Sequence, residues 1–97
     1  MPYYVTLGQW TEQGVRNVKD VPKRAEASKA LVEKNGGKVF SALVTMGRYD
    51  FVLVSELPND EAAMQVALTI GSQGNARTTT LKGWTAQEAA KVVAKIP

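Results

Sequence analysis

The sequence predicts an α+β domain of the ferredoxin-like type, with a four-stranded antiparallel sheet built in the order βαββαβ and followed by a C-terminal helix. Three observations support this prediction. The chain has 97 residues, enough for one domain over residues 1–97 but not for two. Four segments rich in β-branched and aromatic residues alternate with segments of helical periodicity. The middle two follow each other across a short turn, which is typical of a hairpin. Right-handed crossovers would then place the first and third strands at the centre of the sheet, with two helices on one face.

The first half of the chain supplies one strand and its crossover helix. Residues 3–10 are aromatic and β-branched and predict the first strand. Thr11 is a good cap for a short turn or helix over 12–19. Pro22 suits the first turn of the main helix, which we expect over 21–35 before Gly36-Gly37 ends it. Small and apolar residues recur there at helical spacing, namely Val21, Ala25, Ser28, Leu31 and Val32.

The second half supplies the hairpin, the second helix and the last strand. Residues 38–46 and 49–57 read as two strands joined by a tight connection at Gly47-Arg48. Asn59 is a good helix cap and is followed by acidic residues, so a helix should run from there to about Ser72. The rest of the chain predicts a fourth strand over 76–84 and a short helix capped by Thr85, whose apolar face is Ala86, Ala89, Ala90 and Val93.

The composition excludes several classes of chemistry. The sequence has no cysteine and no histidine, so it cannot form a disulfide, a thiolate zinc site, an iron–sulfur cluster or a Ser-His-Asp triad. Metals that take oxygen ligands, such as Mg²⁺ or Ca²⁺, would remain. The carboxylates nearest to each other on a strand face, Asp50 and Glu56, are too far apart to share a metal. We therefore expect no metal site and no cofactor.

The net charge of +3 comes from residues 16–34. In this segment basic and acidic residues alternate at helical spacing, as in the i,i+4 pair Asp20–Arg24. Such a pattern is typical of a solvated helix face, because a surface that tracks nucleic-acid phosphates would not interleave acids. We expect no nucleic-acid partner. No apolar run reaches the ~18 residues of a membrane span, and no signal peptide is evident, so we also expect no membrane association and a cytoplasmic location.

The third predicted strand is apolar on both faces. Phe51 and Leu53 point one way, whereas Val52 and Val54 point the other. The helices can cover only one face of the sheet. The simplest cover for the other face is a second copy of the chain, packed sheet to sheet about a twofold axis. We therefore expect a homodimer or a larger assembly built from it.

The sequence Gly47-Arg48-Tyr49-Asp50, at the expected hairpin, resembles the GYD domain family. Two further stretches, residues 12–14 with 19–24 and residues 71–81, fit the same family pattern, so the resemblance covers roughly residues 3–84. The resemblance implies a dimeric α/β barrel made of ferredoxin-like subunits. It implies no particular reaction, substrate or cofactor, because the family has no defined biochemical function.

Asp50 is the candidate catalytic residue. It shares a strand face with Arg48, and if that face meets the partner subunit, both lie at the mouth of the interface. There they would bind a polar ligand, with Asp50 as a general base, or form an ion pair that fixes the hairpin or crosses the dimer. Tyr49 points to the opposite face, either as a pocket wall or as a ring packed on the helices.

Tyr4 and Trp10 are the candidate aromatic walls of a ligand pocket. Together with Thr6 and Gly8 they share one side of the first strand, which we expect to face the second subunit. They would line a pocket between the sheets or simply pack the interface. Arg77, on the fourth strand, is either an anion contact or an edge charge that discourages aggregation of the sheet.

Two kinds of function remain open. The first is a homo-oligomeric module that binds a small molecule or assembles with other copies, in keeping with the two-faced sheet and the missing histidine and cysteine. The alternative is a small cofactor-independent enzyme of the oxygenase or isomerase type, as hosted by similar barrels. It would use Asp50 as base and Arg48 or Arg77 as anion clamp. The enzyme hypothesis requires a partly polar cavity that contains Asp50.

Overall fold

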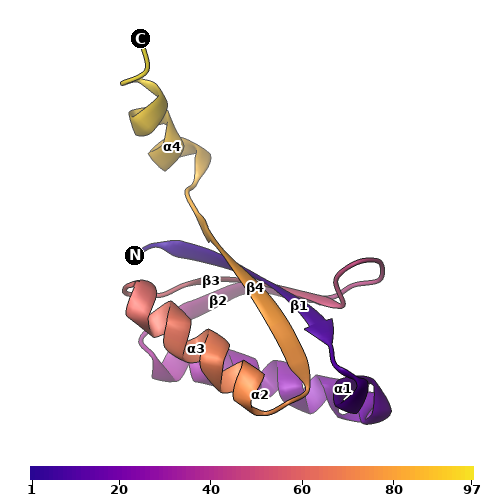
Figure 1. Cartoon of the computed structure of the whole chain (residues 1–97). Helices are drawn as coiled ribbons and strands as arrows, with labels where there is room; N and C mark the ends of the chain where they lie inside the picture. Colours follow the sequence, from indigo (N-terminus) through magenta and orange to yellow (C-terminus); the bar gives the residue numbers. More distant parts are fainter.

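Four antiparallel strands form one sheet in the computed structural model, which describes residues 1–97 (Figure 1). The strands are β1 (Tyr3–Trp10), β2 (Lys38–Val44), β3 (Phe51–Glu56) and β4 (Ala76–Gly83). The helices are α1 (Glu12–Arg16), α2 (Val21–Lys34), α3 (Asp60–Ser72) and α4 (Ala86–Val93), and a 3₁₀ turn, η1 (Val18–Asp20), joins α1 to α2. The spatial order β2-β3-β1-β4 confirms the predicted ferredoxin-like fold. No helix combines the length and the apolar character that a membrane crossing needs.

The predicted capping residues begin three of the four helices. The hydroxyl of Thr11 accepts a hydrogen bond from the N–H of Gly14 at 3.1 Å. The side chain of Asn59 accepts from Ala62 at 2.9 Å at the start of α3. Thr85 and Glu88 form a reciprocal capping box at the start of α4. These bonds satisfy N–H groups that the helices themselves leave without partners.

The connection between β2 and β3 is wider than the tight turn predicted at Gly47-Arg48. Both strands stop short of it and leave residues 45–50 as a loop. Thr45 closes this loop, because its N–H donates to the carbonyl of Asp50 at 2.8 Å and its hydroxyl to the carbonyl of Tyr49 at 2.6 Å. At the tip, Gly47 has a φ of 110°, a conformation that other residues rarely adopt.

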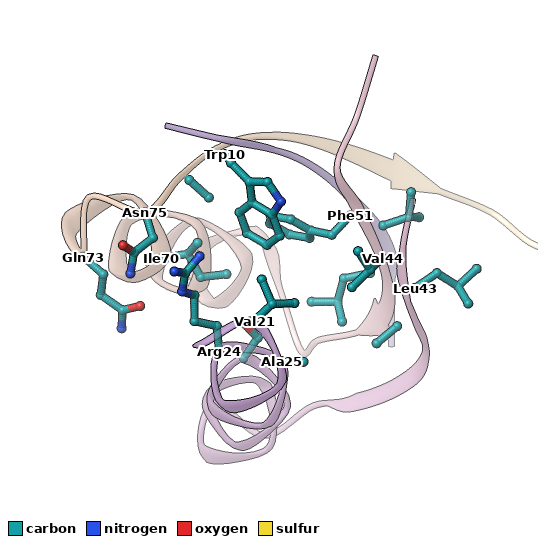
Figure 2. A pocket seen from close by; sticks show the side chains of 15 residues that line it. Trp10, Val21, Arg24, Ala25, Leu43, Val44, Phe51, Ile70, Gln73 and Asn75 are labelled. Carbon is teal, nitrogen blue, oxygen red and sulfur yellow. The ribbon is translucent and has the colours of Figure 1, made fainter. Parts of the chain in front are cut away.

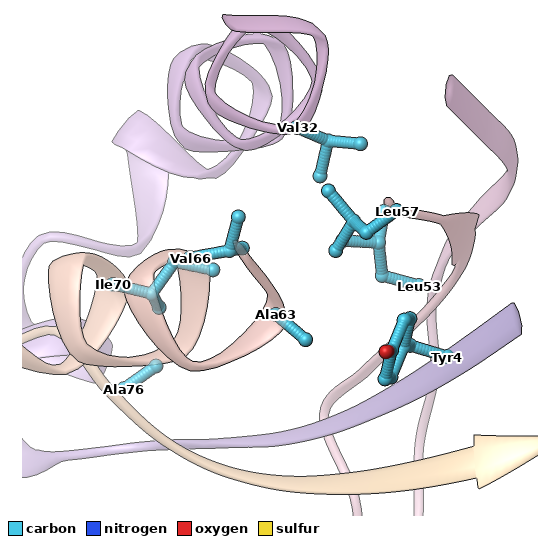
Figure 3. Packing of buried hydrophobic residues seen from close by; sticks show 8 residues of the cluster. All are labelled: Tyr4, Val32, Leu53, Leu57, Ala63, Val66, Ile70 and Ala76. Atoms are coloured by element: carbon cyan, nitrogen blue, oxygen red, sulfur yellow. The ribbon is translucent and has the colours of Figure 1, made fainter. Parts of the chain in front are cut away.

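The hydrophobic core lies between the sheet and the helices α2 and α3 (Figure 3). Tyr4, Thr6 and Gly8 of β1 are buried on this side, beside Leu53 and Ser55 of β3. The expectation that these β1 residues face a second subunit is therefore wrong. Alternation along the strand separated the two faces correctly, but both faces are apolar enough that the pattern does not say which one the helices cover. The core consists of Tyr4, Val32, Leu53, Leu57, Ala63, Val66, Ile70 and Ala76.

The other face of the sheet has no helix over it (Figure 1). The strand register places Val5 opposite Val54 and Leu7 opposite Val52 on this side. Leu43 of β2, opposite Val52, is 60% exposed. An apolar second face is thus confirmed. We call it the open face and define it by Val5, Leu7, Leu43, Val52, Val54 and Leu81.

The helix α4 stands apart from the rest of the chain (Figure 1). Beyond Gly83 the chain leaves the edge of the sheet, and α4 points away from the body. None of its residues is buried. Val92 and Val93 are more than half exposed, as is Ile96 just beyond the end of the helix. Its apolar side therefore has no cover within this chain.

Candidate functional site

A cavity of about 80 Å³ lies between the sheet, α2 and the C-terminal end of α3 (Figure 2). Eleven of its fifteen lining residues are hydrophobic. One lining residue is charged, and the others with polar side chains are Ser28, Gln73 and Asn75. The charged and apolar residues that line it are Arg24 with Trp10, Val21, Ala25, Ala42, Leu43, Val44, Phe51, Val52, Leu53, Ile70 and Ala76.

Arg24, near the start of α2, supplies the charge on the cavity wall. Its Nη2 donates to the carbonyl of Gly14 at 3.1 Å and to the carbonyl of Asn17. The guanidinium carbon lies 5.4 Å from the ring centroid of Trp10, within range of a cation–π interaction. Its Nη1 is buried and has no hydrogen-bond partner. No carboxylate lies within ion-pair distance of Arg24, so this half-buried cation has no counter-ion in the chain.

The sequence pattern pointed to a different role for Arg24, as part of a solvated face paired with Asp20. That pairing is wrong. The turn η1 brings the C-terminal end of α1 against α2. The carbonyls of Gly14 and Asn17 there accept hydrogen bonds from the guanidinium in place of Asp20. One signal was available, because position 24 falls between Val21 and Ser28 at helical spacing and so lies beside the buried stripe.

Trp10 lines the cavity, as an aromatic pocket wall should. Its ring packs against Phe51 with centroids 4.9 Å apart. The ring of Phe51 in turn covers Gly8, where an added Cβ would overlap the ring carbons. The glycine is needed for this close approach. The cavity nevertheless differs from the expected one, since it lies within a single chain rather than between two sheets.

Asp50 is not among the residues that line the cavity. Its Oδ2 accepts a hydrogen bond from the backbone N–H of Trp10 at 2.7 Å, and its own N–H donates to the carbonyl of Gly8 at 2.7 Å. The carboxylate thus takes the place of a strand carbonyl where β1 runs beyond its last pairing with β3. It forms no ion pair with Arg48.

The other four candidate site residues, Tyr4, Arg48, Tyr49 and Arg77, lie outside the cavity. Arg48 is exposed in the β2–β3 loop, with its carbonyl accepting from the side chain of Gln9 and its guanidinium 5.7 Å from the ring of Tyr49. Arg77 is exposed on the edge strand β4, opposite Gln9. The structure therefore brings Trp10 and Asp50 together and places Arg48 beside Tyr49.

Tyr4 joins three elements at the other end of the core. Its hydroxyl donates to Oδ1 of Asp60 at 2.6 Å, and Nζ of Lys82 lies 3.0 Å from the same oxygen. Burial, followed by the bond to Asp60, raises the pKa of Tyr4 to about 12. The hydrogen bond from Tyr4, followed by that from Lys82, lowers the pKa of Asp60. This cluster ties β1, α3 and β4 together.

The family assignment follows from a match to residues 4–93, described as the GYD domain. The chain belongs to the GYD domain family. The match runs further than the similarity over residues 3–84 suggested, because it includes α4. The C-terminal helix is therefore part of the family pattern.

A similar sequence and a similar solved structure both come from Thermus thermophilus. This GYD domain is 29% identical over 83 residues to a protein of that organism named "Glutamine synthetase and cystathionine beta-lyase binding protein", and the alignment covers 84% of this chain and 87% of that protein. The crystal structure of TTHA0845 from the same organism has a TM-score of 0.56 to it at 20% identity, covering 89% of this chain and 96% of that one. The structural likeness shows a shared fold.

The cavity of this GYD domain is lined mainly by apolar side chains. Its wall combines one cation, three uncharged polar side chains and a large apolar surface. No carboxylate lines it, so none of its side chains is placed as a general base. The Asp50 that the enzyme hypothesis requires lies outside.

Proposed function

We propose that this GYD domain is a homodimeric binding module that holds partner proteins, and that its two copies pack through their open faces. The observation that carries the proposal is the apolar open face itself. Valine and leucine side chains from β1, β2, β3 and β4 form one continuous surface there, and the chain has no element to cover it. Soluble monomers rarely expose contiguous apolar patches of this kind.

A second copy is the cover that best fits this surface. Twofold symmetry lets each copy present the same patch to the other, so Val5, Val52 and Val54 would meet their own counterparts. Two sheets stacked face to face lie about 10 Å apart, close enough for such side chains to interdigitate. The result would be the dimeric barrel that the GYD resemblance implies.

The helix α4 supports the same assembly. Its apolar residues face solvent in the single chain, and eight residues are too few for a stable isolated helix. Packing on a second copy would supply the missing contacts.

The partner-protein part of the proposal is supported by the relative named for binding glutamine synthetase and cystathionine beta-lyase. It is also supported by the outer side of α3, which the sheet-to-sheet dimer leaves free. Met64 and Leu68 are 60% and 64% exposed there and lie one helical turn apart. Glutamine synthetase is the first partner to test.

Light scattering on a sizing column tests the dimer. The wild-type chain should elute with twice the 10.5 kDa mass of one copy. Val54→Asp would bury a carboxylate at the centre of the interface and should give monomers, whereas Ser72→Asp on α3 should leave the dimer intact. A wild-type monomer at micromolar concentration would overturn the proposal.

Binding to purified glutamine synthetase from the organism that encodes this chain tests the partner. The wild-type chain should bind the immobilised enzyme, and the double variant Met64→Glu, Leu68→Glu should lose binding while remaining dimeric. Lys29→Glu, an exposed change on α2, serves as the control. A dimer that gives no signal with this enzyme would contradict the partner assignment alone.

A further inference from the structure

We infer that the cavity beside Arg24 is a binding site for a small organic monoanion, namely a carboxylate with a short apolar group. This inference goes beyond the proposed function, because the cavity is lined by one chain and needs neither a second copy nor a partner protein.

The charge of Arg24 is the first step of the argument. Its Nη2 is held by the carbonyls of Gly14 and Asn17, while Nη1 is buried without a partner. Buried N–H donors are nearly always hydrogen-bonded in folded proteins. A guanidinium is also permanently charged, and this one has no counter-ion in the chain. Its charge, set in a mainly apolar wall, favours binding of an anion.

The surroundings define what kind of anion fits. Figure 2 shows the guanidinium of Arg24 reaching from α2 toward Trp10 and Ile70, and Gln73 and Asn75 line the same cavity. One free donor group on a single cation suits a monoanion better than a phosphate dianion, which usually gathers several donors. A carboxylate would accept from Nη1 and from a neighbouring amide.

The apolar wall limits the size of the attached group. At about 80 Å³ the cavity is roughly half the volume of an engineered cavity of about 150 Å³ that takes up benzene. It would therefore hold an apolar group of about three or four carbon atoms. Butanoate combines this size with the required charge and is the probe we would use.

The experiment is an NMR titration of the uniformly ¹⁵N-labelled full chain with sodium butanoate. A ligand this small binds in the millimolar range at ordinary ligand efficiency, so the titration runs to about 50 mM, with sodium chloride keeping the ionic strength constant. The indole N–H of Trp10 and the amides of Ala25 and Ala76 should shift and saturate. The uncharged analogue 1-butanol should bind about tenfold more weakly or not at all.

Variants then assign the effect to the site. Arg24→Gln should weaken butanoate binding by about tenfold or more, while Arg77→Gln, which removes an exposed arginine, should leave it unchanged. Because Arg24 also holds α1, Ala42→Leu provides a second variant that fills the cavity from β2 and leaves the arginine in place. It should abolish the butanoate shifts and keep a folded spectrum.

Three results would overturn the inference. They are a folded wild-type spectrum without saturating shifts at the cavity, equal binding of butanoate and 1-butanol, and unchanged butanoate binding in both Arg24→Gln and Ala42→Leu. None of these readouts depends on the mass of the assembly, so this site and the proposed dimer fail or succeed separately.

Discussion

The carboxylate of Asp50 accepts a hydrogen bond from the backbone N–H of Trp10 at 2.7 Å. The N–H of Asp50 at the same time donates to the carbonyl of Gly8. These two bonds attach the β2–β3 loop to the end of β1 and hold Trp10 where it lines the cavity. The aspartate of the GYD motif thus has a structural role in this chain.

Replacing Asp50 should therefore cost stability. Asp50→Ala leaves the half-buried N–H of Trp10 without its acceptor and should lower the free energy of unfolding by about 1–3 kcal/mol. Asp50→Asn keeps an acceptor oxygen and should lose less. Urea unfolding measures both, with the exposed Glu26→Ala as control. An Asp50→Ala variant as stable as the wild type would contradict this role.

Gly8 should tolerate no side chain while Phe51 keeps its place. Gly8→Ala puts a Cβ into the Phe51 ring and should destabilise the fold by about 1–3 kcal/mol. Combining it with Phe51→Leu should cost less than the sum of the two single changes. In Gly71→Ala the new Cβ meets nothing within 4 Å, and α3 should gain up to about 1 kcal/mol. Additive effects of Gly8→Ala and Phe51→Leu would argue against this contact.

Stability should fall at alkaline pH through Tyr4. Its pKa is about 12 in the folded chain against an ordinary value of 10.0, so the unfolded chain loses this proton first. The contribution is complete below pH 10.0 and is lost as the pH rises toward about 12. Lysines titrate in the same range, so the measurement is the difference in urea midpoint between wild type and Tyr4→Phe at each pH. A difference that stays constant from about pH 8 to about pH 11 would refute the assignment.

The contribution of Asp60 to stability should be lost at acidic pH. Its folded pKa lies below the ordinary value of 3.8, so its contribution is present above that pH and is lost as the pH falls through the folded value. The stability difference between wild type and Asp60→Asn should therefore shrink on acidification. A difference that grows below about pH 4 would show that folding raises the pKa of Asp60 instead of lowering it.

Two equivalent caps should have unequal effects. Asn59→Ala and Thr85→Ala each remove a side-chain cap, but α3 packs on the core whereas α4 does not. Asn59→Ala should lower the free energy of unfolding by about 1 kcal/mol. Thr85→Ala should fray residues 86–93 in NMR chemical shifts and lower the urea midpoint less than Asn59→Ala does. Equal shifts of the midpoint would mean that α4 is already integrated into the body of the chain.

The order of elements was predictable from local signals. Capping residues, paired glycines and runs of β-branched residues placed nearly every strand and helix, because each depends on neighbours in sequence. The sequence predicts a tighter β2–β3 turn than the structure has. The width of this loop depends on hydrogen bonds from Thr45, and no known turn motif predicts them. The sequence does not predict which side of β1 the helices cover. The side with Val5 and Leu7 is as apolar as the side with Tyr4, Thr6 and Gly8.

The site was harder to predict than the fold. The alternation along β1 predicts Trp10 as a pocket wall, because it shares one side of the strand with Tyr4, Thr6 and Gly8. The sequence does not single out Arg24, since its partners are main-chain carbonyls of Gly14 and Asn17, which carry no sequence signature. An unpaired buried nitrogen becomes visible only once α1, α2 and the sheet are assembled around it.

The pairing of Tyr3 with Gly83 has a consequence for synthesis of the chain on the ribosome. The central strand β1 is made first, but its partner β4 is completed about 4 to 15 s later at a translation rate of about 5–20 residues per second. Throughout that interval the edge of β1 that pairs with β4 has no hydrogen-bonding neighbour. The nascent chain would be most exposed to aggregation at this stage, and a chaperone that shields residues 3–10 would act before β4 is made.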